Sequence, residues 1–311
     1  MILRIPEVAR SAKPGQFLTL RISKHYPPFL RRPFSIYRIV KPDLVQILYD
    51  VVGKGTQLLS QKKTGEYIDA LGPLGNGFDL SLPCRLASRR SPLGARLSAK
   101  PREAEGSRGK PSEAEGSRGR AGATTEGSAI LVGGGVGIAP LFFLAEKLII
   151  SGQDKITVLI GARTKKEIIS KKEFQALGCD VRISTDDGSL GFKGRVTDLL
   201  KCQLSAIPAL PARLAALASR RSPLGEAEGS RGKPRAGRSY QLSAIYACGP
   251  KPMLKQIVAT CKRRNIRAQV SLDEYMACGL GVCLGCVVKT KQGLKRVCHD
   301  GPVFEARLLN L

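Results

Sequence analysis

Short apolar segments with an alternating or β-branched pattern dominate the first 80 residues. "GQFLTLRI" (15–22), "PFSIYRIV" (33–40) and "LVQILYDVV" (44–52) are separated by Pro, Gly and Asp turns. An alternation of period two turns one side of each strand toward a core, and short strands joined by tight turns are typical of antiparallel barrels. The pattern therefore predicts a small antiparallel β barrel over residues 1–83.

From residue 129 the pattern changes to apolar strands that alternate with helical segments. "AILVGGGVGIAPLFFLAEKLI" (129–149) combines a strand, a glycine-rich turn and a helix. The alternation continues in "KITVLIGAR" (155–163), "CDVRISTDDG" (179–188), "GRVTDLLK" (194–201) and "IYACGPKPML" (245–254). This predicts an α/β domain with a parallel sheet over 129–265, and the glycine turn stands where such sheets bind nucleotides. The usual G-x-G-x-x-G with a ribose-binding acid is not cleanly present, which indicates a dinucleotide site of another type.

Two repeated stretches interrupt this order. "LASRRSPLG" occurs at 86–94 and 217–225, "EAEGSRGKP" at 103–111 and 226–234, and "QLSAI" brackets the second stretch at 203–207 and 241–245. Their Gly/Ser/Arg/Glu/Pro composition lacks apolar periodicity, so they cannot bury enough surface to offset chain entropy. We interpret residues 84–128 and 203–240 as translated insertions of a repeated element and expect both to be disordered.

The formal net charge of +26 is high enough to suggest a nucleic-acid partner. The two insertions carry +10 of it, and the remaining basic residues form no stripe with interleaved aromatics. This distribution favours a solvated basic surface over a nucleic-acid site. The start "MILRIPEVAR" has no apolar leader segment, and the apolar run 130–150 contains glycines, Pro140, Glu146 and Lys147. We therefore expect no membrane segment, a cytoplasmic location and no disulfide framework.

Four cysteines near the C-terminus have a spacing typical of metal ligands. "ACGLGVCLGC" (277–286) places Cys278, Cys283 and Cys286 at x4 and x2 spacing, and Cys298 follows. Zinc sites usually come as two paired knuckles, whereas x4/x2 with a separate fourth Cys matches the plant-type [2Fe–2S] loop. The spacing favours an iron–sulfur cluster over zinc, with buried free thiols third. The other cysteines show no ligand spacing, and only the position of Cys248 suggests a role; they are Cys84, Cys179, Cys202, Cys248 and Cys261.

Two short stretches of the barrel carry groups suited to a flavin nucleotide. In "RRPFSIY", Arg32 and Phe34 share a strand face and Ser35 adds a hydroxyl, a combination that can hold a diphosphate and cover a ring. In "VVGKGTQLL", Gly55 and Thr56 stand where a helix begins and backbone N–H groups are free. Each signal alone is weak, because a turn glycine or a buried strand aromatic explains it equally well.

Taken in order, the motifs resemble those of one family. "RPFS", "GKGT", "LGPLGNGF", "LVGGGVGIAPL", "TDDGSLGFKG", "YACGPKPML", "EYMACGLGVCLGC" and "VCHDGPVF" are similar to the PyrK family. These are electron-transfer subunits of NAD-dependent (class 1B) dihydroorotate dehydrogenase, in the ferredoxin–NADP reductase superfamily. The resemblance covers nearly everything outside the insertions. It implies an FAD-binding barrel at 1–83, an NAD-binding domain at 129–265 and a [2Fe–2S] domain at 266–311.

The resemblance also implies site residues. It assigns Cys278, Cys283, Cys286 and Cys298 as cluster ligands, places Cys248 beside the nicotinamide, and names no acid–base catalyst. The implied cofactor-binding residues are Arg32, Pro33, Phe34, Ser35, Leu48, Tyr49, Gly55 and Thr56 for FAD, and Gly133, Gly134, Gly135, Gly137, Cys248, Gly249 and Pro250 for NAD.

The implied function is electron transport in pyrimidine (UMP) biosynthesis. The resemblance implies an oxidoreductase subunit that passes electrons from NADH through FAD and the cluster to or from the FMN of a PyrD-type catalytic subunit. The expected assembly is a heterotetramer with two copies of each subunit, without nucleic acid or membrane. Cofactors carry such chemistry while the protein positions and tunes them.

The sequence departs from the family pattern at two points besides the insertions. Asp50 stands where the family often has Arg, and the first barrel strand expected of the family is missing before "MILRIPEVAR". Alternative interpretations are the small subunit of a NADPH:ferredoxin or sulfide dehydrogenase, in which Asp replaces the first cluster Cys, a zinc-stabilised or nucleic-acid-binding scaffold, and an inactive, insertion-disrupted copy.

Overall fold

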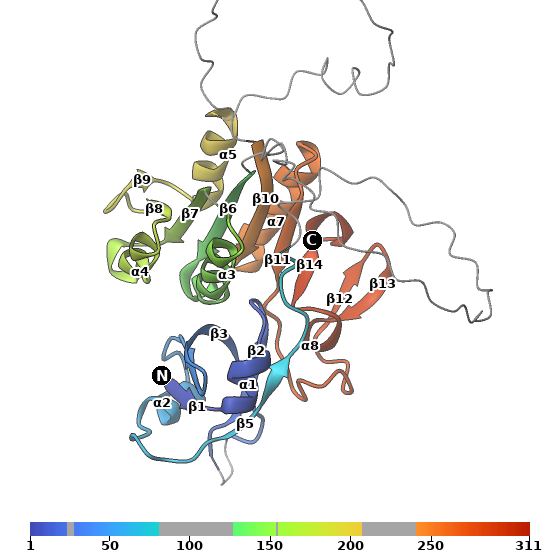
Figure 1. Cartoon of the computed structure of the whole chain (residues 1–311). Helices are drawn as coiled ribbons and strands as arrows, with labels where there is room; N and C mark the ends of the chain where they lie inside the picture. The colour runs from blue at the N-terminus through green and yellow to red at the C-terminus, as the bar shows by residue number, and fades with distance from the viewer. Residues whose placement is uncertain (24–27, 81–126, 154, 207–240) are drawn as a thin grey trace, which may run out of the picture.

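The computed structural model describes residues 1–23, 28–80, 127–153, 155–206 and 241–311. These residues form three parts, a barrel-like sheet, an α/β layer above it and a small C-terminal part packed against both (Figure 1). Residues 81–126 and 207–240 lie outside the described residues, and they contain most of the two stretches interpreted as insertions, 84–128 and 203–240.

The N-terminal part is an antiparallel sheet, as the alternating pattern predicts. Its described strands have the order β1-β4-β3-β2-β5. They are β1 (Ile2–Arg4), β2 (Phe17–Arg21), β3 (Arg32–Lys41), β4 (Leu44–Ile47) and β5 (Asp69–Leu74). Leu18, Leu20, Ile36, Val45 and Ile47 point inward and pack into one core. Two short helices cover it, α1 (Pro6–Ser11) and α2 (Lys54–Ser60).

Two details of this sheet differ from the prediction. The strand predicted over 44–52 ends at Ile47, because Val51 and Val52 are exposed and their segment turns toward α2. The helix α1 was not predicted; it begins at Pro6, a residue suited to a first helical turn, and buries only Val8.

The α/β part contains a sheet whose described strands have the order β14-β11-β10-β6-β7-β8-β9. All neighbouring strands are parallel except β11 and β14. The strands are β6 (Gly127–Gly134), β7 (Lys155–Ala162), β8 (Asp180–Thr185), β9 (Phe192–Lys193), β10 (Gln241–Cys248), β11 (Ala268–Ser271) and β14 (Val303–Glu305). The predicted alternation of strands and helices is confirmed.

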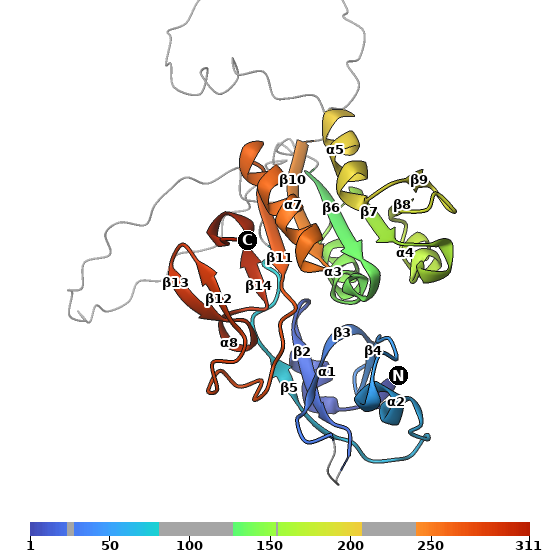
Figure 2. The ribbon, with the colours of Figure 1, turned by 180° about the vertical axis from the view of Figure 1, so that it is seen from behind.

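Helices cover both faces of this sheet. The short turn η2 (Gly135–Ile138) leads from β6 into α3 (Ala139–Ile150). Helix α3 and α4 (Lys171–Ala176) pack on one face, and α5 (Val196–Ala206) and α7 (Lys251–Arg263) pack on the other (Figure 2). The carboxyl ends of β6 and β10 point toward the N-terminal sheet, so the glycine turn lies between the two parts (Figure 1).

The insertion boundaries need a correction. Residues 127 and 128 belong to β6, and residues 203–206 continue helix α5. Leu204 is only 5% exposed and lies in the core, four residues after the buried Leu200. The helical spacing therefore extends into the first "QLSAI" copy, which the predicted boundary at 203 placed in an insertion.

The C-terminal part adds a β hairpin and a short helix. Strands β12 (Val287–Thr290) and β13 (Gly293–Arg296) pair antiparallel, helix α8 (Val297–Asp300) follows, and η4 (Ala306–Leu308) closes the chain. Strands β11 and β14 come from residues 268–305 yet pair within the large sheet. The sheet therefore extends past residue 265, where the domain boundary was predicted, because β11 still pairs in register with β10.

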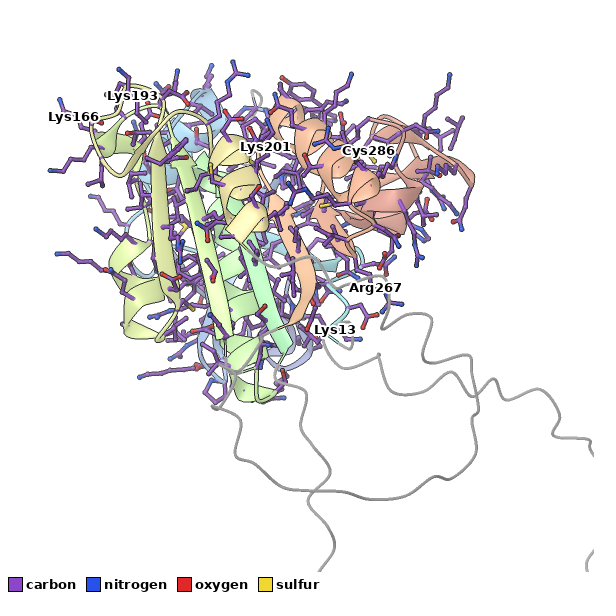
Figure 3. All side chains as sticks on the ribbon, turned by 90° about the horizontal axis from the view of Figure 1, so that it is seen from above. Lys13, Lys166, Lys193, Lys201, Arg267 and Cys286 are labelled. Carbon is purple, nitrogen blue, oxygen red and sulfur yellow. The ribbon has the colours of Figure 1, made fainter. Side chains whose placement is uncertain are left out.

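The basic surface has no single focus in the described residues. Lys166 and Lys193 lie on one side of the molecule and Lys13 and Arg267 toward another (Figure 3). Among the helices that the structure describes, none is both long and apolar enough to cross a membrane.

Candidate functional site

The loop 277–286 holds the first pair of the four predicted ligand cysteines. The Sγ atom of Cys278 accepts hydrogen bonds from the backbone N–H groups of Leu280, at 3.3 Å, and Cys283, at 3.5 Å. The N–H of Gly285 donates to Cys283 Sγ at 3.5 Å. The Cys283 N–H is the main cause that lowers the pKa of the Cys278 thiol to about 6. The loop thus stabilises a thiolate at Cys278, which is only partly buried.

The other two predicted ligand cysteines lie deeper in the protein interior. Cys286 and Cys298 are 3% and 2% exposed, and the N–H of Cys298 donates to Cys286 Sγ at 3.4 Å. The N–H of Gly281 donates to Cys298 Sγ at 3.1 Å, which ties the loop to α8. Cys286 lies beside the large sheet, within the C-terminal part (Figure 3).

Positive backbone φ angles explain the glycines of this loop. Gly279 and Gly281 have φ of +70° and +80°, which L residues rarely adopt. A β-carbon at Gly281 would lie 2.8 Å from His299 Cβ, so the loop could not approach α8 with a larger residue there.

The donor set fits a two-iron cluster. The thiols form two pairs within a network of N–H···S hydrogen bonds, an arrangement typical of iron–sulfur loops. The two thiol pairs match the Cys₄ ligation of a [2Fe–2S] cluster.

The glycine turn after β6 and the turn after β10 lie against each other. Gly133 pairs in register with Cys248. A β-carbon at Gly137 would lie 2.5 Å from the Cys248 carbonyl oxygen and 2.6 Å from Gly249 Cα. A β-carbon at Gly134 would meet the Pro250 ring at 2.9 Å. The structure thus brings the predicted NAD residues to one edge of the sheet, packed backbone to backbone.

Cys248 is the thiol at this edge. It is 6% exposed, and burial raises its pKa to about 12, partly offset by a hydrogen bond with Ser271. The side chain is therefore a neutral thiol near neutral pH. A neutral thiol is a poor proton acceptor.

The predicted flavin residues gather on β3 and the start of α2. A β-carbon at Gly55 would lie 3.4 Å from Arg32 Nε, so the glycine leaves room for the guanidinium beside the helix. The Thr56 hydroxyl donates to the Gly53 carbonyl and accepts from the Val52 N–H, which closes the first turn. A cationic side chain beside the first turn of a helix, where a glycine leaves space, fits a diphosphate.

The remaining predicted flavin residues are divided between two packing layers. Phe34 is 6% exposed in the barrel core and meets Tyr49 edge to face, with centroids 5.5 Å apart. Leu48 packs against the core beneath α3. Ser35 is half-buried opposite Phe17, Pro33 opposite Thr19, and Asp50 is exposed.

Comparisons with known proteins agree on one family. Residues 273–310 match the model of the iron–sulfur cluster binding domain of dihydroorotate dehydrogenase B. The chain is 33% identical over 306 residues to the dihydroorotate dehydrogenase B (NAD(+)) electron transfer subunit of Desulforamulus reducens, covering 96% of this chain and 87% of that one. The corresponding subunit of Geobacillus thermodenitrificans is 35% identical over 303 residues, with the same coverage.

The chain belongs to the family of dihydroorotate dehydrogenase B electron transfer subunits. A solved NADH-dependent reduced ferredoxin-NADP oxidoreductase is also similar, with a TM-score of 0.65, 27% identity, and coverage of 99% of this chain and 83% of that one. The ferredoxin reductase of a carbazole 1,9a-dioxygenase shares the fold, with a TM-score of 0.50 at 15% identity, and covers 85% of this chain and 60% of that one.

An ion pair that the sequence analysis did not predict connects the loop 277–286, called the cluster loop below, to α8. Arg296 Nη1 donates to the Gly281 carbonyl at 2.9 Å, and its Nε lies 3.2 Å from the Asp300 carboxylate. This pair holds the pKa of Asp300 well below its usual range. The pair fixes the cluster loop to α8, and its signal in the sequence was only an Arg and an Asp four residues apart.

The motif "LGPLGNGF" also acquires a structural role. Asn76 Nδ2 donates to the carbonyl oxygens of His299, at 3.3 Å, and Asp300, at 3.1 Å. Asn76 also bridges to Pro302 of "DGPVF". Two motifs of this family, more than 200 residues apart, thus join the end of the barrel sheet to the C-terminal part. This part carries the four predicted ligand cysteines and is called the cluster part below.

Proposed function

We propose that this chain is the electron-transfer subunit of an NAD-dependent dihydroorotate dehydrogenase. It would carry electrons between NAD(H) and the FMN of a PyrD-type catalytic subunit in pyrimidine biosynthesis. The observation that carries the proposal is the arrangement of the four cysteines of loop 277–286 and α8. The Cys283 N–H donates to Cys278 Sγ, and the Cys298 N–H donates to Cys286 Sγ, so the cysteines form two pairs. Bound FAD would supply two-electron exchange with NADH and one-electron exchange with the [2Fe–2S] cluster.

The residues of the chain position these groups. We assign the FAD diphosphate to Arg32, Gly55 and Thr56, because Gly55 leaves room for Arg32 beside the first turn of α2. We assign NAD to the edge formed by Gly133, Gly134, Gly135 and Gly137 with Cys248, Gly249 and Pro250, where missing β-carbons let two turns pack together. Cys278, Cys283, Cys286 and Cys298 would hold the cluster.

The assembly and location follow from the same assignment. We propose a heterotetramer of two electron-transfer and two catalytic subunits in the cytoplasm. The cysteines that the structure describes are all free thiols, which suits a reducing compartment.

A second candidate function rests on the similarity to the NADH-dependent reduced ferredoxin-NADP oxidoreductase. A ferredoxin-linked subunit would share this architecture. The match of residues 273–310 to the dihydroorotate dehydrogenase B domain and the higher identity to those subunits favour the first proposal.

The experiment is a spectroscopic and functional assay of the purified full chain. We expect bound flavin, two irons per chain and bleaching of the visible spectrum by NADH. Mixed with a PyrD-type subunit, the chain should support NAD-dependent oxidation of dihydroorotate. Cys278→Ser should lose iron and this coupled activity. A colourless, zinc-loaded protein, or a flavoprotein that NADH does not bleach, would refute the proposal.

A further inference from the structure

Strand β2 separates the barrel core from the cluster part. Leu18 and Leu20 point into the barrel core, whereas Phe17 packs into the core that also contains Cys286 and Cys298. Successive side chains of a strand point to opposite faces, so Thr19 shares the face of Phe17. Both faces of β2 are buried, and the outer one lies under the cluster part.

Thr19 carries a buried hydroxyl without a partner. The residue is 2% exposed, and its Oγ1 atom has no hydrogen-bond partner among the residues that the structure describes. Ser184 on β8 is the other such side chain in the same set. Burying a hydroxyl without a hydrogen bond is destabilising, so the position calls for a partner beyond the described residues.

The nearest feature on that face is the cluster loop. A β-carbon on Gly279 would lie 2.9 Å from Thr19 Cγ2 and 3.9 Å from Thr19 Oγ1. Gly279 directly follows Cys278, and its positive φ of +70° brings the loop backbone down onto β2. The Thr19 hydroxyl therefore lies at the base of the loop that carries the first two predicted ligands.

We propose that the Thr19 hydroxyl donates a hydrogen bond to a sulfur of the [2Fe–2S] cluster and raises its reduction potential. Hydrogen bonds to the sulfurs stabilise the more negative, reduced state and are among the main determinants of cluster potential. Thr19 then contacts the cluster directly from the barrel sheet and adds an O–H donor to the N–H donors of the loop. The inference rests on the proposed function, because it requires the cluster.

The test compares Thr19→Val with Thr19→Ser in the full chain. Valine keeps the shape and removes the donor, and serine keeps the donor. The midpoint potentials of cluster and flavin are measured by redox titration, with the cluster followed by EPR. We expect Thr19→Val to lower the ratio of reduced to oxidised cluster at a fixed potential about three- to tenfold. Thr19→Ser should stay near wild type, and the flavin potential should not move.

Ser184→Ala is the matched control, because it removes the other unpartnered buried hydroxyl far from the loop and should leave the cluster potential unchanged. An unchanged cluster potential in Thr19→Val, or a shift of the flavin potential alone, would overturn the inference. If Thr19→Val fails to fold, Thr19→Ala against Thr19→Ser makes the same comparison. A wild-type chain without iron would instead refute the proposed function.

Discussion

At the scale of single residues, Gly137 has the tightest surroundings in the proposed NAD site. A β-carbon there would lie 2.5 Å from a backbone oxygen and 2.6 Å from Gly249 Cα, neither of which can move as a side chain would. We expect Gly137→Ala to destabilise the fold by about 2–4 kcal/mol and to abolish flavin reduction by NADH. Both are measured by urea unfolding and stopped-flow absorbance.

Gly135→Ala is the matched control in the same turn. Gly135 has nothing within 4 Å of its missing β-carbon and a φ of +55°, so alanine should cost only about 1 kcal/mol of conformational strain. Equal losses of stability in the two variants would show that close packing is not what requires glycine at 137.

Buried thiols make stability depend on alkaline pH. Burial raises the pKa of Cys179 to about 11 and of Cys248 and Cys261 to about 12, from an ordinary value of 9.0. Above pH 9 the unfolded chain loses these protons while the folded chain keeps them. The free energy of unfolding should therefore fall between pH 9 and 12, by up to about 1.4 kcal/mol per pH unit for each thiol.

Cys261→Ala tests this dependence, because Cys261 packs in the core and has no assigned role. The variant should lose stability at pH 7 but show a shallower decline above pH 9, measured by urea unfolding across the range. Cys202→Ser removes an exposed thiol instead of a buried one and serves as the comparison. An equally steep decline in Cys261→Ala would show that the buried Cys261 thiol does not contribute to the loss of stability above pH 9.

Local spacing was sufficient to predict some of these residues and not others. The thiols of the loop 277–286 lie within ten residues of each other, so their pattern was readable in the sequence. Thr19 reaches the same site from a strand some 260 residues earlier, and its neighbours alternate like those of any barrel strand. Contacts across such separations depend on how the parts dock, which periodicity does not encode.

At the scale of elements, the sequence "QLSA" adopts two structures. Residues 203–206 of the first copy lie at the end of helix α5, where Leu204 is buried and the Ser205 hydroxyl donates to the Lys201 carbonyl at 2.9 Å. The second begins strand β10, where Ala244 and Ile245 are fully buried. Packing against neighbours decides between the two conformations, because intrinsic propensity is the same for both copies. Propensity could therefore not have placed the insertion boundary.

Residues 207–240 lie between helix α5 and strand β10 and outside the described residues. We expect that replacing this segment with a four-residue Gly/Ser linker keeps the fold and raises the free energy of unfolding by about 2 kcal/mol, because a shorter loop costs less entropy to close. Urea unfolding and bound flavin measure the result. Deletion from residue 203 is the comparison: it removes the buried Leu204 as well and should lose about 2–3 kcal/mol of that gain. A destabilised linker variant would mean that 207–240 contributes to the core.

At the scale of the whole molecule, specific side-chain contacts join the three parts. Asn76 links the barrel sheet to the C-terminal part, and Phe17 enters the core shared by the cluster part and the large sheet. Tyr37 on β3 reaches α3, where its ring stacks on Phe142 with centroids 4.6 Å apart. Electron transfer between cofactors held by different parts depends on such contacts, because they set the distances.

Tyr37 offers the sharpest test of this docking. Its hydroxyl donates to Ser170 Oγ at 3.0 Å, and the residue is 5% exposed between the barrel and the α/β part. Tyr37→Phe removes one hydrogen bond and should cost about 1 kcal/mol, whereas Tyr37→Ala also removes the stacked ring and should cost about 3–5 kcal/mol, measured by urea unfolding. Tyr67→Ala, at a position 98% exposed, is the control and should cost little. If Tyr37→Ala and Tyr67→Ala were equally stable, the aromatic contact would not hold the two parts together, and their relative placement would depend on other contacts, such as those of Asn76, Phe17 and Phe78.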